Sequence, residues 1–400
     1  MIILVINAGS SSVKFTCFDM ADGRKVLANG LIERIGIEGT SMKYSNHKGD
    51  GTKGEVAVKD AKEAVKLISD TLVDAKVGVL KSLSEVKAIG HRVVHGGESI
   101  TDPVIIDDKV KATIRDCFAI APLHNPPNLT GIEACEAVFP GVKNVGVFDT
   151  AFHATMPPHA YLYGIPYDLY TDNKIRRYGF HGTSHAYVSR KAAELLGSKP
   201  EDVKVIVCHL GNGGSISAVD GGKCQDTSMG LTPLEGLIMG TRCGDMDPAI
   251  VWNIMKIKNL DAAGVDNYLN KKSGMLGLAG IGSSDLRDIE EGHDKGNKQC
   301  TQALETYAYR IRKYIGSYMA AMGGVDCVAF TAGVGENSAT MREMVLKGLN
   351  GLGFKLDKAK NDVRASEPRF VNTADSPIKI AVIPTDEEQE IAGQTYELVK

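Results

Sequence analysis

Residues 2–18 read IILVINAGSSSVKFTCF, and residues 203–219 read VKVIVCHLGNGGSISAV. In each stretch a continuous apolar run predicts a buried strand, a turn of Gly, Ser and Asn follows, and a second strand returns along the first. Two strand–turn–strand units that lie about 200 residues apart indicate an internal repeat and hence a duplicated domain. The alternative is a coincidence between two short glycine turns.

The rest of the chain alternates apolar runs with segments of helical periodicity. The runs predict further strands at 86–94, 144–148, 325–331 and 378–383. Periodicity, caps and prolines predict helices at 61–80, 128–139, 184–196, 247–258, 298–322, 338–349 and 387–399. Alternation of this kind predicts the α/β class with two domains, because 400 residues exceed one ordinary core. We expect the boundary between 149 and 158, before a pair of prolines.

Composition excludes several classes of protein. The net charge of −3 and the lack of a basic run argue against a nucleic-acid partner. The apolar start is too short for a signal peptide or a membrane span, and no basic residues precede it. The eight cysteines form no C-x-x-C and no zinc-ligand spacing, so we expect reduced thiols and a cytoplasmic location.

Four polar turns that contain glycine stand out. They are NAGSSS at 7–12, RYGFHGTSH at 177–185, HLGNGGS at 209–215 and TAGVGEN at 331–337. The backbone N–H groups of such turns can bind phosphate oxygens. None of them fits the Walker A pattern, and the dinucleotide fingerprint is missing, which counts against a dehydrogenase. Together the four turns predict an enzyme that handles phosphate.

Two arginines and two histidines, His181 and His124, are candidates for contacts with such a ligand. Arg92 lies in an otherwise apolar strand and Arg242 in a glycine-flanked loop, where each suits a bidentate grip on carboxylate or phosphate. Structural ion pairs are the alternative. His181 precedes a helix and could donate to a phosphate, whereas we expect His185 to be structural. His124 is held between prolines and is a third candidate donor.

Two acidic residues follow predicted strands. Asp149 comes directly after the strand at 144–148, and the ligand crevice of α/β folds lies at the carboxyl ends of strands. Glu387 opens the last helix. One of the two could orient a substrate while the other holds Mg²⁺, which prefers oxygen ligands. A helix-opening acid at Glu387 needs no function, because it interacts favourably with the helix dipole.

Taken together, these motifs resemble the acetate and propionate kinase family. The stretches that carry the resemblance are 2–12, 90–97, 122–128, 148–153, 177–185, 227–248, 333–338 and 384–388. The resemblance implies the acetate and sugar kinase/Hsp70/actin (ribonuclease H-like) fold, two duplicated α/β domains around a central nucleotide cleft. It implies an N-terminal domain at 1–150, completed by a helix at 387–400, and a nucleotide-binding and dimerisation domain at 151–386.

The resemblance also implies an activity and its partners. ATP would pass its γ-phosphoryl group reversibly and directly to acetate, giving ADP and acetyl phosphate. The family uses Mg²⁺, which Mn²⁺ could replace, and forms homodimers without nucleic acid or membrane. A propionate or butyrate kinase is the first alternative. A non-enzymatic ATP switch of the actin or Hsp70 kind is the second, and it would leave the two arginines and Asp149 unexplained.

Matching motifs carry the family's residue roles onto this sequence. The implied catalytic residues are Arg92, His124, Asp149, His181 and Arg242. The implied metal-side residues are Asn7 and Glu387. The implied acid-binding residues are Arg92, Val94, Leu123, Phe180 and Pro233. The implied nucleotide site comprises Ser12, Lys14, His209, Leu210, Gly211, Asn212, Gly213, Asp285, Leu286, Arg287, Gly333, Val334, Gly335, Glu336 and Asn337.

Overall fold

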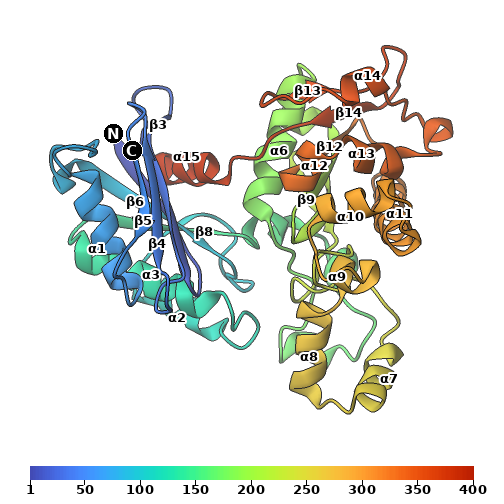
Figure 1. Cartoon of the computed structure of the whole chain (residues 1–400), viewed down its shortest axis with the longest axis horizontal. Helices are drawn as coiled ribbons and strands as arrows, with labels where there is room; N and C mark the ends of the chain where they lie inside the picture. The colour runs from blue at the N-terminus through green and yellow to red at the C-terminus, as the bar shows by residue number, and fades with distance from the viewer. The chain divides into compact units, whose positions relative to one another are not determined.

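The computed structural model describes residues 1–400, which divide into two compact units (Figure 1). The first unit comprises Met1–Ala154 and Asp386–Lys400, and the second comprises Thr155–Thr385. Each unit contains one β-sheet against which helices pack, so the predicted α/β class is confirmed. None of the helices combines the length and the apolar composition that crossing a lipid bilayer requires.

The first unit is built on an eight-stranded sheet with the order β5-β4-β3-β2-β1-β6-β8-β7. Alternate residues of β1 point to opposite faces of this sheet. Leu4 and Ile6 lie in the hydrophobic cluster that includes α1 and α3, and Ile3 and Val5 lie in the cluster that includes α15. The strands are β1 (Ile2–Ala8), β2 (Ser12–Asp19), β3 (Lys25–Glu33), β4 (Ser41–Asn46), β5 (Gly51–Glu55), β6 (Val86–Val93), β7 (Val104–Ile105) and β8 (Lys143–Phe148). The helices are α1 (Ala61–Leu72), α2 (Asp108–Asp116), α3 (Asn125–Val138) and α15 (Glu387–Val399).

The second unit is built on a six-stranded sheet with the order β11-β10-β9-β12-β14-β13. Its strands are β9 (Lys204–Leu210), β10 (Gly214–Asp220), β11 (Lys223–Thr227), β12 (Cys327–Thr331), β13 (Arg369–Phe370) and β14 (Lys379–Val382). Its helices are α4 (Pro158–Tyr161), α5 (Asp168–Thr171), α6 (Gly182–Leu195), α7 (Ala249–Lys258), α8 (Ala262–Lys271), α9 (Gly274–Ala279), α10 (Leu286–Asp294), α11 (Lys298–Met322), α12 (Ala332–Asn337), α13 (Ala339–Leu346) and α14 (Lys358–Asn361).

The two sheets share one topology. The first hairpin is antiparallel in both, β1 with β2 and β9 with β10. In the first unit, β1 then pairs parallel with β6, and β6 pairs parallel with β8. In the second unit, β9 pairs parallel with β12, and β12 pairs parallel with β14. A short antiparallel strand, β7 or β13, closes the edge. The repeat that the two strand–turn–strand stretches predicted is therefore a duplicated fold and no coincidence.

Two local predictions were wrong. The helix expected at 61–80 ends at Leu72, because the Asp74 carboxylate accepts hydrogen bonds from the N–H groups of Lys76 and Val77 and stabilises a turn. The segment 331–337, expected to be a turn, forms helix α12 directly after β12. Glu336 stabilises the start of that helix, since its Oε1 atom accepts from the backbone N–H of Ala332 at 2.8 Å.

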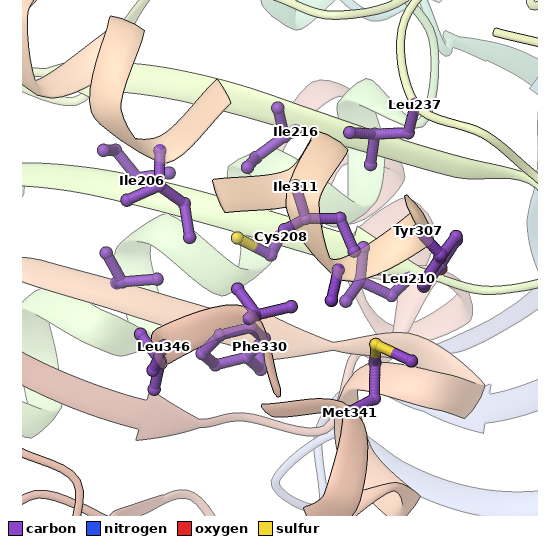
Figure 2. Close-up of a cluster of buried hydrophobic side chains, with 14 of the residues drawn as sticks. Ile206, Cys208, Leu210, Ile216, Leu237, Tyr307, Ile311, Phe330, Met341 and Leu346 are labelled. Atoms are coloured by element: carbon purple, nitrogen blue, oxygen red, sulfur yellow. The ribbon is translucent and has the colours of Figure 1, made fainter. Parts of the chain in front are cut away.

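The core of the second unit lies between its sheet and α11. Figure 2 shows Ile206 and Cys208 of β9, Phe330 of β12 and Ile311 of α11 in one cluster of buried side chains. All four have 0% exposure to solvent. Interiors of this kind are closely packed, so a missing side chain leaves a cavity.

We expect Phe330→Ala to lower the free energy of unfolding of the second unit by about 3–5 kcal/mol, through lost burial and the cavity left behind. Chemical denaturation measures this change. The matched control is Leu352→Ala, whose side chain is 52% exposed, and which should change the free energy of unfolding by at most about 0.5 kcal/mol. Equal effects of the two substitutions would contradict the assignment of this core.

Candidate functional site

The carboxyl ends of three parallel strands bring polar residues together in the first unit. Asn7 lies near the end of β1, Arg92 near the end of β6, and Asp149 directly after β8. Because these strands are neighbours in the sheet, the three residues share one edge. The N–H of Asp149 donates to the carbonyl of Val93 at 2.9 Å, which fixes the start of the loop.

Arg92 and Asp149 form a bidentate ion pair. Nε of Arg92 donates to Oδ1 of Asp149 at 3.0 Å, and Nη2 donates to Oδ2 at 2.6 Å. The Asp149 side chain is only 2% exposed, and this carboxylate raises the pKa of Arg92 above its usual value. Nε of Arg92 also lies 3.8 Å from Oε2 of Glu387, whose pKa burial raises. The guanidinium of Arg92 therefore forms ion pairs with two carboxylates.

This edge of the sheet suits a hard cation. The Asn7 amide and the Glu387 carboxylate supply oxygen atoms, and Arg92 compensates only one of the two acidic charges beside it. Lys14 forms its ion pair with Glu388, so Arg92 is the cation that pairs with Glu387. The structure holds no group of three or more His, Cys, Asp or Glu residues in a metal-binding arrangement. Side-chain oxygen atoms such as those of Asn7 and Glu387 are the ligand type that Mg²⁺ prefers.

In the second unit, His181 and Arg242 flank Gly213. His181 precedes α6 with a left-handed backbone, φ 58°. A Cβ atom on Gly213 would lie 3.4 Å from Nη1 of Arg242 and 3.7 Å from Nε2 of His181, so the bare glycine leaves room between them. Arg242 pairs with no carboxylate; its Nη1 donates to the carbonyl of Pro233 at 3.2 Å, and burial lowers its pKa. A partly buried cation of this kind favours an anionic ligand.

A cavity of about 560 Å³ lies within the second unit. Segments from three parts of the chain meet around it: the turn after β9, the start of α10, and α12. The predicted nucleotide residues that line it are Gly211, Asn212, Asp285, Leu286, Arg287, Gly333, Val334 and Asn337. Gly213, which lies near Arg242 and His181, follows the lining residue Asn212 in the chain.

Other predicted nucleotide residues lie outside the cavity lining. Leu210 is buried in the core of the second unit, and the ring of His209 stacks on that of His181 with centroids 4.2 Å apart. Glu336 turns toward the backbone of its own helix, and a Cβ on Gly335 would lie 3.3 Å from the Phe330 backbone. The remaining two belong to the first unit, in strand β2: Ser12 and Lys14.

The predicted acid-binding residues divide between the units. Val94 is buried just after β6, and Leu123 is 62% exposed, both in the first unit. Phe180 is buried before α6, and Pro233 lies in the loop that carries Arg242, both in the second. His124 immediately precedes α3, between Leu123 and the prolines, and makes no side-chain hydrogen bond to cap that helix.

Sequence reasoning missed several residues around these segments. The cavity is also lined by Gly240, Met275, Ser284, Glu290, Tyr307, Ser338 and Arg364.

Two asparagines that the sequence did not single out stabilise loops of the first unit. The side-chain oxygen of Asn125 accepts a hydrogen bond from the N–H of His95, and that of Asn128 accepts one from the N–H of Val94, each at 3.0 Å. An Asn beside prolines could have suggested a cap, but nothing in the sequence names partners 30 or more residues away.

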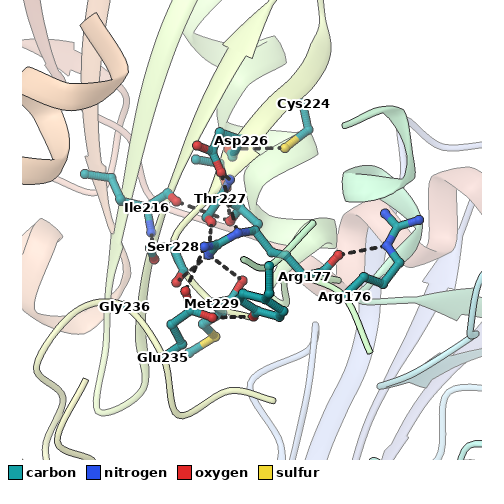
Figure 3. A network of polar contacts seen from close by, with 12 residues as sticks. Arg176, Arg177, Ile216, Cys224, Asp226, Thr227, Ser228, Met229, Glu235 and Gly236 are labelled. Carbon is teal, nitrogen blue, oxygen red and sulfur yellow. Dashed lines mark hydrogen bonds and ion pairs between the residues drawn. The ribbon is translucent and has the colours of Figure 1, made fainter. Parts of the chain in front are cut away.

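The most extensive missed contact belongs to Arg177, which ties the loop after β11 to the segment before His181 (Figure 3). Its Nη1 donates to the carbonyls of Thr227 and Ser228 at 2.8 and 3.1 Å. Its Nη2 donates to Oε1 of Glu235 at 2.7 Å. The loop from 228 to 245 carries both Pro233 and Arg242 without regular structure, so Arg177 helps to fix the positions of those residues.

We expect Arg177→Met to lower the free energy of unfolding by about 2–4 kcal/mol, because Glu235 and two carbonyls would lose a largely buried donor. Thermal or urea unfolding measures the loss. Arg115→Met is the matched control: Arg115 pairs with Glu133 where both side chains are about half exposed, and such pairs contribute at most about 1 kcal/mol. A loss no larger than that of the control would show that Arg177 is dispensable.

Comparison with known proteins identifies the family. Residues 2–393 match the model of the acetokinase family. An acetate kinase of Thermoanaerobacterium thermosaccharolyticum is 55% identical over 100% of this chain and 99% of that protein. The crystal structure of Porphyromonas gingivalis acetate kinase has a TM-score of 0.95 at 45% identity, and that of a propionate kinase from Francisella tularensis 0.92 at 41%, each covering 100% of both chains. The chain belongs to the acetokinase family.

Proposed function

We propose that this protein is an acetate kinase, which transfers the γ-phosphoryl group of ATP reversibly to acetate and forms ADP and acetyl phosphate. The observation that carries the proposal is that a cavity and an arginine without a carboxylate partner lie at the same turn. Gly211 and Asn212 line the cavity, and Gly213, the next residue, lies near Arg242 and His181. Full-length relatives of 52–55% identity bear the name acetate kinase. They favour acetate as the acceptor.

The second unit is proposed to bind the nucleotide. A cavity of about 560 Å³ can hold a purine nucleoside, since small-ligand sites have volumes of roughly 300–1,000 Å³. The nucleotide's phosphates would then follow the glycines of the turn, where the backbone can approach them closely. Arg242 and Nε2 of His181 would donate hydrogen bonds to the γ-phosphoryl oxygens.

The first unit is proposed to supply the metal-side and acid-orienting groups. Glu387 and Asn7 would hold Mg²⁺, which, when bound, neutralises charge that develops on the phosphate oxygens. Asp149 holds Arg92 by two hydrogen bonds, so the guanidinium is oriented before a substrate arrives. Val94 and Leu123 are the residues of this unit that are proposed to contact the methyl group of the acid.

The proposed chemistry needs no strong base. A carboxylate is already ionised at neutral pH, so an acetate oxygen can attack the γ-phosphorus directly, and the bond from that phosphorus to the bridging oxygen of ADP breaks in line. The protein's contribution is positioning and charge stabilisation, which is sufficient for phosphoryl transfer. Arg242, Arg92 and His181 are the groups that would stabilise the transferring phosphoryl oxygens.

A homodimer in the cytoplasm is part of the proposal. Helix α7 exposes Ile250 and Ile257, seven positions apart on one face, by 40% and 77%, and a second copy of this chain could cover them. All eight cysteines are free thiols, which is usual in a reducing compartment.

Propionate is the second candidate acceptor, because the Francisella propionate kinase matches the whole chain at 41% identity.

We expect MgATP turnover to ADP to require a carboxylic acid and to be fastest with acetate. The measurement is ADP release with acetate, propionate, butyrate or no acid. A preference for propionate would retain the chemistry and reassign the acceptor, because one methylene changes binding by only about 1–3 kcal/mol. Turnover equal to the blank without acid would refute the proposed kinase and favour an ATP switch.

We expect Arg92→Ala and Arg242→Ala each to lower kcat by about 10²–10³, the usual cost of a lost donor to the transition state. Steady-state kinetics with saturating MgATP and acetate measure the effect. Arg115→Ala, an arginine with an exposed partner on α3, should leave kcat unchanged and controls for loss of positive charge. A rise in KM with an unaltered kcat would reject the transition-state role of either arginine.

A further inference from the structure

A serine hydroxyl joins two histidines next to the predicted phosphoryl site. Oγ of Ser215, in strand β10, lies 2.8 Å from Nδ1 of His181 and 2.7 Å from Nε2 of His185. Ser215 and His185 are both 0% exposed to solvent. Their distances are those of strong hydrogen bonds, so both bonds form together in the folded chain.

The chemistry of a hydroxyl restricts how these bonds can be arranged. Ser215 has one proton, which it can donate to only one of the two imidazole nitrogens, and it must accept from the other. When Ser215 donates to one of the two rings, the nitrogen that accepts is bare and the facing nitrogen of the other ring carries a proton. The protonation states of His181 and His185 are coupled through this single oxygen, although the rings belong to residues four positions apart on the chain.

One of the two arrangements suits the site. If Ser215 donates to Nδ1 of His181, a neutral His181 carries its proton on Nε2, the atom that lies beside Gly213 and Arg242. The reverse arrangement with a neutral His181 would leave a lone pair on Nε2. That lone pair would face the anionic oxygens that Arg242 favours, and the contact would be repulsive.

The ring of His181 also packs against a second imidazole. The ring of His209 stacks on it, with centroids 4.2 Å apart and planes inclined by 20°. Nδ1 of His209 is in turn 2.8 Å from Oγ of Ser184, which lies 2.8 Å from Oγ1 of Thr385. In this packing Nδ1 of His181 faces Ser215 and Nε2 faces Gly213.

We infer that Ser215 and His185 are positioning residues that fix His181 as the tautomer protonated on Nε2, so that His181 donates a hydrogen bond to the transferring phosphoryl group. The ligand named here rests on the proposed kinase function. The tautomer itself does not, because it is a property of the protein without substrates. The inference also replaces the expectation that His185 serves only the fold.

The test is ¹⁵N NMR of the full chain labelled at histidine, at neutral pH and without substrates. Two-bond ¹H–¹⁵N correlations distinguish a protonated ring nitrogen from a bare one, and His181→Asn identifies the signals of His181. The expected result is a protonated Nε2 and a bare Nδ1. A proton on Nδ1 with a bare Nε2, or protons on both nitrogens, would overturn the inference whatever the variants do.

Variants then test what Ser215 contributes. Ser215→Ala should give a mixture of tautomers and lower kcat about 10–100-fold, the usual cost of losing a supporting hydrogen bond, while KM for ATP and acetate changes less than threefold. Ser215→Thr keeps the hydroxyl and should restore both the tautomer and most of kcat. Ser217→Ala is the matched control, since Ser217 is equally buried in β10 but bonds to Thr227, and it should alter neither.

The outcomes separate this inference from the proposed function. Ser215→Ala with the wild-type tautomer and kcat would show that Ser215 has no positioning role. A chain that turns over none of the acids, yet shows the protonated Nε2 and loses it in Ser215→Ala, would refute the kinase and retain the tautomer assignment. An equal loss of kcat in Ser217→Ala would show that both substitutions act by destabilising strand β10, and it would overturn the specific role of Ser215.

Discussion

The parallel pairing of a hairpin's first strand with the next strand along the sheet is the constraint on which both units depend. β1 pairs with β6, and β9 with β12, so in each unit the strand that ends in a polar turn ends beside another strand end. In the first unit this pairing places Asn7 near Arg92, and in the second it places Thr331 opposite His209. Duplication of one topology thus supplies two edges that can hold charged groups.

The two sheet edges differ in whether a carboxylate neutralises the positive charge of the nearby arginine. Asp149 holds the guanidinium of Arg92 in a fixed position by two hydrogen bonds. Arg242 has only a carbonyl and a thioether as hydrogen-bond partners. A cation that lacks a counter-ion costs stability unless a ligand provides one, and so the second unit is the one prepared for an anion.

Much of this architecture could be predicted from periodicity and turns, whereas contacts between distant segments could not. The helices at 298–322 and 387–399 occupy the predicted residues, because long apolar periodicity and clear caps decide their limits. The strands β3, β4 and β5 were missed, since their mixed polar sequences pair only once β2 offers an edge. Gly-rich 331–337 folds as a helix because Glu336 supplies hydrogen-bond acceptors that composition does not reveal.

The site residues show the same limit. Residue type identified Arg92, Asp149, His181 and Arg242 as candidates, but it gave no reason to single out Ser215, which is one of many serines. A serine becomes important only when the strand β10 brings its oxygen within 2.8 Å of two imidazoles that the turn and first residues of α6 present. Hydrogen-bond donors and acceptors are matched in three dimensions, so a residue that orients a catalytic group is visible only in the folded chain.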